Sequence, residues 1–369
     1  MSLTRDILDR VFFPNRDVHA IPVLDGGFSP NRRLDDAEVL AEVPDADGLC
    51  IDAGGTVYAS RGSRIVCWSK GDFSNGPVTF SELDGPVGSL AAHPDGRILA
   101  AITGHGLAAL EKEGRIAGKL ERAGDAALGC VTAIAVLPDG SIALTDGSRH
   151  NTADRWLQDM MEKRAGSGRL IICAPDLSAA RVVCDRLDWP GGVVASGPRS
   201  VFVTEAWTHR LLAVATDQGN SSVIVKNFAG YPSRMKPASD GGVWTAFFAM
   251  RTQLTEFVLR EDPFRKRMMA NVPPELWIGP SLGDHFDYRE PTQIGRIKKL
   301  GIQKPWAPPR SYGLVVRIDG EGNALESLHS RVSGTLHGIT DIVETDGRLI
   351  VASKGHGKLA GIELARGEA

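Results

Sequence analysis

The polar residues of this chain that could do chemistry do not form a standard catalytic motif. The stretch FAGYPSRM (228–235) places a hydroxyl and a guanidinium, Ser233 and Arg234, where an apolar strand begins. A guanidinium in such a position can hold a carboxylate or stabilise an oxyanion. A structural role is the alternative, in which Arg234 pairs with Asp47 and joins two distant segments. The sequence has no GxSxG elbow, HExxH zinc site or phosphate-binding loop.

A repeated strand–turn–strand pattern indicates which elements position these residues. Two of its copies are SLAAHPDGRILAA (89–101) and AIAVLPDGSIALT (133–145). Asp-Gly and Gly-Gly turns between apolar runs are typical of β-hairpins. The six turns fall at Gly55, Gly96, Gly140, about Arg199, Gly241 and Gly347. Strand repeats about 40–45 residues apart are typical of propeller blades. The sequence therefore predicts an all-β fold, a six-bladed β-propeller formed by residues 1–369 as a single domain.

Two spacings between turns are too long for one blade and indicate insertions in blades three and five. Residues 150–168 contain a short predicted helix. Residues 247–309 begin with apolar residues at helical spacing, which Pro263 interrupts, and continue as a proline-rich loop. We expect both insertions to lie over one face. A loop of this length is usually a lid or a binding loop; a homo-oligomer contact and simple padding are the alternatives.

The first strand of each blade lines the channel of a propeller, so the entrance ends of these strands locate the candidate site. Positions eight residues before the turns should meet there. They are Asp47, Gly88, Thr132, Gly191, Ser233 and Ile339, or Thr340 if the last register shifts by one residue. The predicted substrate-binding residues are Arg234, Ser233, Thr132, Thr340, His150 and Tyr231.

Acid–base candidates come from this ring and from the ends of the second strands. Asp146 in ALTDGSRH and Glu205 in FVTEAWTHR occupy equivalent positions in blades three and four. A carboxylate at the end of a buried strand is costly unless it is paired or functional. Hydrogen bonding to loop amides is the alternative for both. His337 precedes the last inner strand, and we predict Asp47, Glu205, Asp146 and His337 as catalytic candidates.

The order of several runs along the chain resembles a known group of proteins. The runs include IPVLDGGFSPNRRLDDAEVL, TDGSRHN, NFAGYPSRM and YGLVVRIDGEGNALESLHS. They are similar to the strictosidine-synthase-like proteins, which share a superfamily with the gluconolactonase (SMP-30) and paraoxonase enzymes. The resemblance covers nearly the whole chain and implies a six-bladed propeller. It also implies hydrolysis of a lactone, ester or related bond, with amine–aldehyde condensation or non-catalytic binding of a ligand or protein as alternatives.

Metal-dependent members of that superfamily hold a divalent cation, usually calcium, at the channel mouth. Position by position, their ligands correspond to Asp47, Thr132, Gly191, Ser233 and Arg234. A hard cation needs several oxygen ligands, including carboxylates, and Asp47 alone supplies one. We therefore predict no metal and no cofactor. The acid–base glutamate of the plant strictosidine synthases corresponds to Thr340, which is no acid, so their reaction is not carried over.

Composition and charge limit the kinds of partner that this protein is expected to have. The net charge is -3 without a basic tract, which argues against nucleic acid and anionic membrane surfaces. The N-terminal run has the character of neither a signal peptide nor a membrane helix. Five cysteines without CxxC spacing are typical of reduced thiols in a cytoplasmic protein, although Cys173 and Cys184 could face each other across a hairpin. We expect a small organic substrate, and Arg234 would suit an anionic one.

Overall fold

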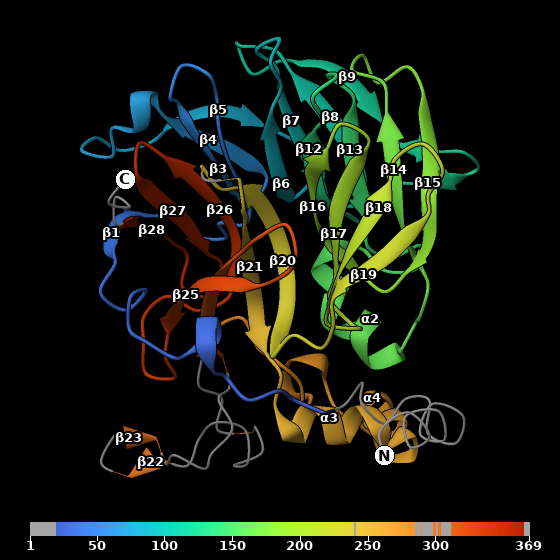
Figure 1. Ribbon diagram of the computed structural model, residues 1–369, viewed down its shortest axis with the longest axis vertical. Coiled ribbons are helices and arrows are strands. Elements are labelled where there is room, and N and C mark those ends of the chain that lie inside the picture. The colour runs from blue at the N-terminus through green and yellow to red at the C-terminus, as the bar shows by residue number, and fades with distance from the viewer. Residues whose placement is uncertain are drawn as a thin grey trace.

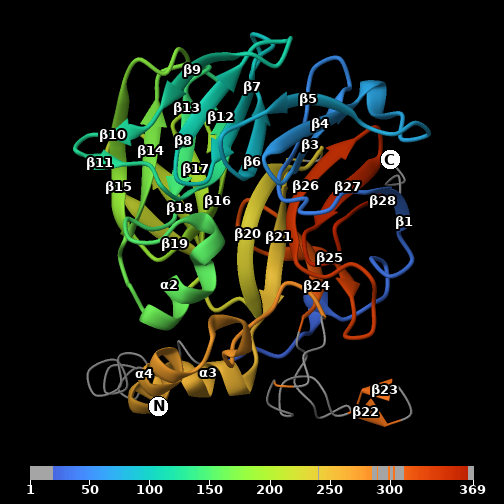
Figure 2. The same ribbon diagram turned by 180° about the vertical axis from the view of Figure 1, so that it is seen from behind.

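The computed structural model describes residues 20–239, 241–284, 289, 298–299, 302–303 and 311–364. Six four-stranded antiparallel sheets are arranged around a common centre (Figure 1). The same ring of blades is seen from behind in Figure 2. The predicted six-bladed β-propeller is confirmed.

The first four blades are each built from four strands that follow one another along the chain. Blade one contains β2 (Leu49–Ile51), β3 (Val57–Arg61), β4 (Arg64–Trp68) and β5 (Val78–Glu82). Blade two contains β6 (Val87–Ala92), β7 (Ile98–Ile102), β8 (Gly106–Leu110) and β9 (Ile116–Leu120). Blade three contains β12 (Val131–Val136), β13 (Ile142–Asp146), β14 (Gly168–Cys173) and β15 (Ala180–Leu187). Blade four contains β16 (Pro190–Gly197), β17 (Ser200–Glu205), β18 (Arg210–Ala215) and β19 (Ser221–Val225).

The last two blades depart from this simple order. Blade five contains β20 (Gly230–Pro237), β21 (Val243–Met250), β24 (Gly313–Ile318) and β25 (Ala324–Ser330). Blade six contains β26 (Ile339–Thr345), β27 (Arg348–Ser353), β28 (Lys358–Glu363) and β1 (Glu38–Glu42). Because β1 pairs with β28, segments from both ends of the described chain share one sheet. This pairing closes the ring of blades.

Several short elements lie outside the six blade sheets. They are the 3₁₀ turns Gly26–Phe28, Ser69–Gly71, Ala153–Arg155 and Pro274–Leu276, and the two-residue strands β10 (Arg122–Ala123), β11 (Ala126–Ala127), β22 (Lys298–Lys299) and β23 (Ile302–Gln303).

The predicted hairpin turns lie between the first and second strands of the blades. Gly96 and Gly140 have φ angles of 93° and 83°, in the left-handed region that glycine enters without steric cost. Blade four differs, because Gly197 pairs with Ser200 across a two-residue turn. The turn residue Arg199 is not among the residues with positive φ, so this hairpin needs no glycine there.

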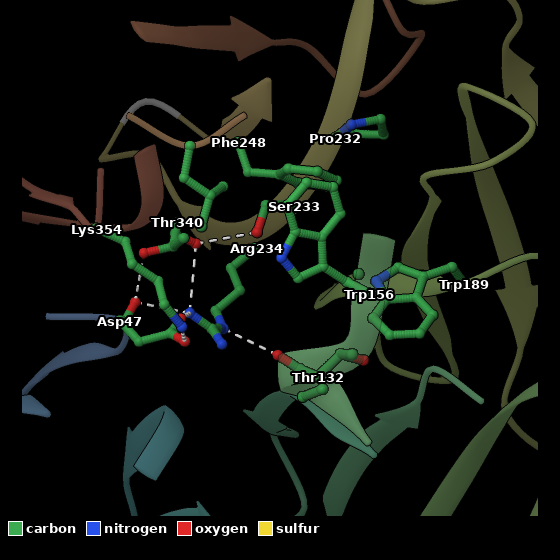
Figure 3. Close-up of a pocket in the computed structure, with 13 residues that line it drawn as sticks. Asp47, Thr132, Trp156, Trp189, Pro232, Ser233, Arg234, Phe248, Thr340 and Lys354 are labelled. Atoms are coloured by element: carbon green, nitrogen blue, oxygen red, sulfur yellow. Dashed lines mark hydrogen bonds and ion pairs between the residues drawn. The ribbon is translucent and has the colours of Figure 1, made fainter. Parts of the chain in front are cut away.

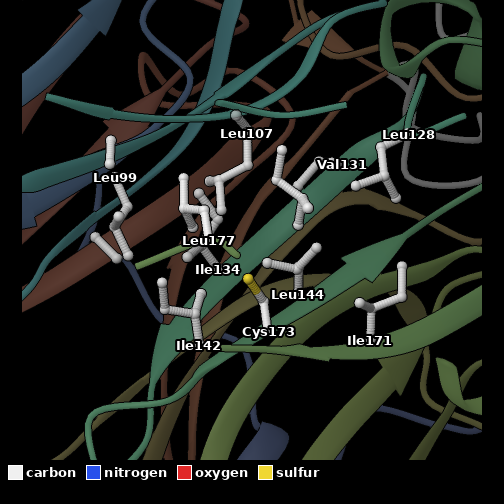
Figure 4. Close-up of a cluster of buried hydrophobic side chains, with 14 of the residues drawn as sticks. Leu99, Leu107, Leu128, Val131, Ile134, Ile142, Leu144, Ile171, Cys173 and Leu177 are labelled. Atoms are coloured by element: carbon white, nitrogen blue, oxygen red, sulfur yellow. The ribbon is translucent and has the colours of Figure 1, made fainter. Parts of the chain in front are cut away.

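Apolar side chains fill the space between neighbouring blades. In the cluster between blades two and three (Figure 4), Leu99 and Leu107 pack with Ile142, Leu144 and Ile171, and none of the five is exposed. Each such side chain contributes about 1.5–3 kcal/mol relative to leaving it in water. These blade-to-blade layers fix the inner strands and therefore the geometry of the channel.

Both insertions contain helices, which lie at one end of the propeller (Figure 1). The first forms α2 (Trp156–Glu162), and the second forms α3 (Gln253–Arg260) and α4 (Asp262–Asn271). Pro263 stands in the first turn of α4, where its missing N–H is tolerated. It thus separates two helices. The second insertion begins after Met250 rather than at 247, because β21 extends that far, and most of its proline-rich part lies outside the described residues.

The cysteine pair considered from the sequence is not formed. Cys173 lies opposite Ala180 in the β14–β15 ladder, whereas Cys184 lies opposite Leu170. All five cysteines are free thiols.

Candidate functional site

The ring positions meet in a pocket at the channel mouth (Figure 3). Its empty space is roughly 530 Å³, part of it open to solvent. The residues that line it are Asp47, Thr132, Ala153, Trp156, Trp189, Gly191, Pro232, Ser233, Arg234, Phe248, Leu282, Thr340 and Lys354. Of the two candidate ring positions in blade six, Thr340 rather than Ile339 lines the pocket. Gly88 lies under the guanidinium, since a Cβ on it would stand 3.4 Å from Arg234 Nη2.

Arg234 reaches from the inner strand of blade five across the channel. Its Nε donates to the carbonyl of Thr132 at 2.9 Å, and its Nη1 donates to Asp47 Oδ1 at 2.6 Å and to the Asp47 carbonyl at 2.7 Å. The side chain is 8% exposed. One guanidinium therefore connects blades five, three and one. The pairing with Asp47 was the structural alternative predicted from the sequence, and the contact with blade three was not predicted.

Lys354 is a second cation on the same carboxylate. It follows directly after β27, and its Nζ lies 2.5 Å from Asp47 Oδ2. Burial raises the pKa of Asp47, but the charges and hydrogen bonds of Arg234 and Lys354 outweigh burial and hold it well below its ordinary value. Asp47 is therefore ionised, and two positive charges face one negative charge on the pocket floor.

The hydroxyl groups of the ring are engaged with backbone carbonyls. Thr132 Oγ1 donates to Pro190 O at 2.5 Å, Ser233 Oγ to Thr340 O at 3.1 Å, and Thr340 Oγ1 to Asp47 O at 2.8 Å. Activation of a hydroxyl as a nucleophile requires a base that takes its proton. These three hydroxyls instead link neighbouring inner strands and retain only acceptor capacity for a ligand.

Aromatic side chains form the walls of the pocket. Trp156 of α2 and Phe248 of β21 meet edge to face, with ring centroids 5.2 Å apart. Trp189, which precedes β16, stacks on Trp207 at 5.1 Å. Apolar walls above a charged floor suit a small molecule with an apolar body and one carbonyl or negatively charged end.

Asp146, predicted as an acid or base, lies outside this pocket in a buried ion pair. Its Oδ2 accepts from Arg169 Nη2 at 2.8 Å, and its Oδ1 accepts from the backbone N–H of Cys130 at 3.1 Å. Burial raises the pKa of Asp146, although Arg169 opposes that shift. No surface of its side chain is exposed, so the structure gives it the loop-bonding role that was the alternative.

Glu205 is held in the same way. It accepts from the backbone N–H of Asp188 at 2.8 Å and from Thr208 Oγ1 at 3.1 Å, and it pairs with Arg210. Its side chain is fully buried and does not line the pocket. These contacts fix the loop that enters blade four.

The remaining three predicted residues also lie apart from the pocket lining. His337 is buried, with Nδ1 2.7 Å from Ser311 Oγ and Nε2 2.6 Å from the carbonyl of Arg331; burial lowers its pKa. The hydroxyl of Tyr231 donates to Glu256 at 3.4 Å in a buried cluster. His150 is exposed. Of the ten predicted residues, the pocket brings together Asp47, Arg234, Ser233, Thr132 and Thr340.

Lys354 and the aromatic walls were not predicted from the sequence. Lys354 directly follows Ser353, the position in blade six that corresponds to Asp146 and Glu205. That correspondence, read one residue further, could have found it. Trp156 lay in a predicted insertion without any signal that it turns towards the channel.

The channel mouth does not suit a divalent cation of the kind that metal-dependent members of the resembled superfamily hold there. Across the part of the chain that the structure describes, no three His, Cys, Asp or Glu side chains are grouped to hold a metal ion. Both oxygens of Asp47 accept from cations. A calcium ion would have to displace two resident positive charges and would gain a single carboxylate.

Among the residues that the structure describes, no helix combines the length and apolarity needed to cross a membrane.

Comparison with known proteins gives distant likenesses. No family model matches the chain. It is 24% identical over 364 residues to the mouse adipocyte plasma membrane-associated protein, covering 90% of this chain and 79% of that protein. The rat protein of the same name is also 24% identical, with 90% and 87% covered.

Solved structures match over most of their length. A gluconolactonase from Xanthomonas campestris has a TM-score of 0.58 at 14% identity, with 94% of this chain and 95% of that chain covered. Regucalcin from Agrobacterium tumefaciens, a calcium-binding protein, has a TM-score of 0.56 at 15% identity, with 89% and 93% covered. At these identities the likeness shows a shared propeller fold.

Proposed function

We propose that this protein is a hydrolase that cleaves a small lactone or ester at the channel mouth without a divalent metal. The observation that carries the proposal is the Arg234–Asp47–Lys354 cluster on the floor of an aromatic-walled pocket. Fixed positive charge at this place would stabilise the negative charge that develops on a carbonyl oxygen during attack. The fold shared with a gluconolactonase supports the choice of a lactone.

The residues of the cluster have separate roles in this reaction. Lys354, whose side chain is 33% exposed, is accessible to a substrate and would donate to its carbonyl oxygen, whereas the buried Arg234 positions Asp47. Water adds to the carbonyl carbon and passes a proton to Asp47. The bond to the leaving oxygen then breaks, and that oxygen takes the proton from Asp47. The low pKa of Asp47 makes it a weak base in the first step and a strong acid in the second.

The test is hydrolysis of lactones and aryl esters in the presence of a chelator. We expect the wild type to remain active in EDTA and Lys354→Met to lower kcat/KM by about 10²–10³-fold. Lys119→Met is the matched control, because the Lys119 side chain is also 33% exposed and pairs with a carboxylate, Asp84, but does not line the pocket. Equal activity of the two variants would overturn the proposal.

Non-catalytic binding of a small organic anion is a second candidate. It is favoured by the hydrogen bonds that already occupy both oxygens of Asp47, because such a carboxylate is a poor base. A binding protein would change the fluorescence of Trp156 and Trp189 when a carboxylate is added, without forming product. Amine–aldehyde condensation has less support, since Asp47 is the single carboxylate among the described lining residues and is ionised.

The partners and location predicted from the sequence remain predictions. These are a cytoplasmic location, no nucleic-acid or membrane partner, and a homo-oligomer contact through residues 247–309. The name of the mouse and rat relatives makes the location worth testing directly, by cell fractionation.

A further inference from the structure

A short segment of the blade-five insertion is fixed to both sides of the pocket mouth. We call residues 279–284 the strap. At its beginning, the backbone of Gly279 lies against α2: a Cβ there would stand 2.8 Å from Leu157 Cδ1 and 2.9 Å from Met161 Cε. A side chain at this position would have to displace the ends of these two side chains. The strap therefore starts in direct contact with the first insertion.

The other end of the strap is held by loops of blade six. The carbonyl oxygen of Leu282 would be 2.6 Å from a Cβ on Gly338 and 2.0 Å from a Cβ on Gly355. Gly338 also has a φ of 61°, which disfavours any side chain. Two residues further on, Asp284 Oδ1 lies 3.2 Å from His356 Nε2. The backbone at Leu282 is thus held by close packing against two glycines and by the His356–Asp284 hydrogen bond two residues further on.

Between these anchors, the side chain of Leu282 lines the pocket together with Trp156, Phe248 and Lys354. Within the described part of the chain after Met250 and before blade six, Leu282 is the single residue that does so. Leu282 packs against the apolar cluster that contains Phe248, and the same pocket is lined by the reachable cation Lys354. A group that extends from a carbonyl at Lys354 along the aromatic walls would meet this side chain.

We propose that Leu282 is a specificity-determining residue that limits the length of the apolar group on the substrate, so that the pocket takes lactones and esters with short alkyl or acyl chains. This inference rests on the proposed function for its catalytic readout. The closely packed backbone makes the limit sharp, because Leu282 can yield to a longer chain only by a change of rotamer and not by a shift of its backbone. Added methylenes that do not fit a rigid pocket cost about 10–200-fold each in kcat/KM.

The experiment measures kcat/KM for aryl esters with straight acyl chains from acetyl to decanoyl. In parallel, tryptophan fluorescence measures the affinities of the corresponding free carboxylates. Leu282→Ala removes the isopropyl group, and we expect its optimum to move to a chain longer by about one to three carbons, with at least a 10-fold gain for the longest chains. Leu282→Met preserves the volume and should keep the wild-type profile.

Two further variants separate this effect from general loosening. Leu276→Ala alters the same insertion at a half-buried side chain that does not line the pocket, and it should leave the profile unchanged. Gly355→Ala changes no lining side chain but must displace the Leu282 carbonyl, so it should shift the profile.

The two readouts distinguish failure of the inference from failure of the proposed function. If carboxylates bind and the Leu282→Ala affinities shift to longer chains while no ester is cleaved, the inference stands and the hydrolase proposal falls. If esters are cleaved but Leu282→Ala and Leu276→Ala both keep the wild-type profile, the inference is wrong. A wild type that neither binds nor cleaves any member of the series would overturn both.

Discussion

Arg234 Nη1 lies 2.6 Å from Asp47 Oδ1, although the two residues are 187 positions apart in the chain. The same guanidinium donates to the backbone carbonyls of Asp47 and Thr132. It therefore carries structural and electrostatic roles at once: it holds three inner strands together and keeps Asp47 ionised beside the pocket.

Replacing Arg234 should cost stability as well as function. Arg234→Met leaves Asp47 buried with Lys354 as its remaining partner, and we expect a loss of about 3–5 kcal/mol in the free energy of unfolding. Asp47→Asn should cost less, because an amide oxygen can still accept from the guanidinium. A double-mutant cycle measured by urea unfolding should give a coupling energy of about 0.5–3 kcal/mol. If the losses in unfolding free energy of the two single variants add up to that of the double variant, the interaction between Arg234 and Asp47 does not contribute to stability.

Calcium should leave the protein unaffected. Because cations already occupy both oxygens of Asp47, millimolar calcium or EDTA should shift the melting temperature by less than about 1 °C. A site that binds calcium at 100 times its Kd would instead add about 2.7 kcal/mol of stability, a shift of several degrees. Such a calcium-dependent rise in Tm, seen by differential scanning calorimetry, would contradict our account of the channel mouth.

The fold and the ring of the site could be predicted because both follow from local, repeated chemistry. Glycine turns such as Gly96 mark five of the six hairpins, and a constant offset from the six turns led to Asp47, Thr132 and Ser233. The offset holds because the first strands of all six blades begin at the same end of the propeller, and side-chain positions alternate along each strand. By the same alternation Asp341, which follows Thr340, does not line the pocket, and its Oδ2 accepts from the N–H of Leu49.

The rest of the site comes from segments that lack this regularity. Trp156 and Leu282 belong to insertions, whose path over the propeller depends on tertiary packing. The sequence also cannot distinguish a paired carboxylate from a free one. Asp146 and Glu205 each end the second strand of a blade, where a functional acid could stand, but they form ion pairs with Arg169 and Arg210. A cation next to Asp146 in space lies 23 residues away in the chain, so no local pattern reveals it.

Trp156 should contribute to ligand affinity more than to stability. Its side chain is half-buried and meets Phe248 edge to face. Trp156→Ala should weaken binding of an aromatic or alkyl carboxylate by about 10-fold, a change typical of losing one aromatic contact. Trp156→Phe keeps an edge-to-face partner and should lose less than about threefold. Both affinities can be measured by titration calorimetry; equal affinities in the wild type and Trp156→Ala would mean that ligands do not use this wall.

The buried histidine His329 should make stability fall as the solution becomes acidic. Its ring nitrogens lie 3.1 Å from the Tyr312 hydroxyl and 2.8 Å from Ser327 Oγ, and burial lowers its pKa to about 4. An unfolded histidine has a pKa of about 6.5. Between these two values the unfolded chain binds the proton and the folded chain does not. The stabilisation from His329 is therefore complete above pH 6.5, decreases as the pH falls below 6.5 and is lost once the pH has fallen through 4. The part lost between pH 7 and pH 5 is about 2 kcal/mol.

The variant His329→Gln cannot take up this proton, so its stability should depend less on pH. We expect the gap in unfolding free energy between wild type and variant to narrow by about 2 kcal/mol from pH 7 to pH 5. His105→Gln is the control, because His105 is exposed and its substitution should preserve the wild-type pH dependence. Urea unfolding at both pH values gives all three curves. A gap for His329→Gln that stays constant with pH would mean that the folded protein protonates His329 as readily as the unfolded chain does.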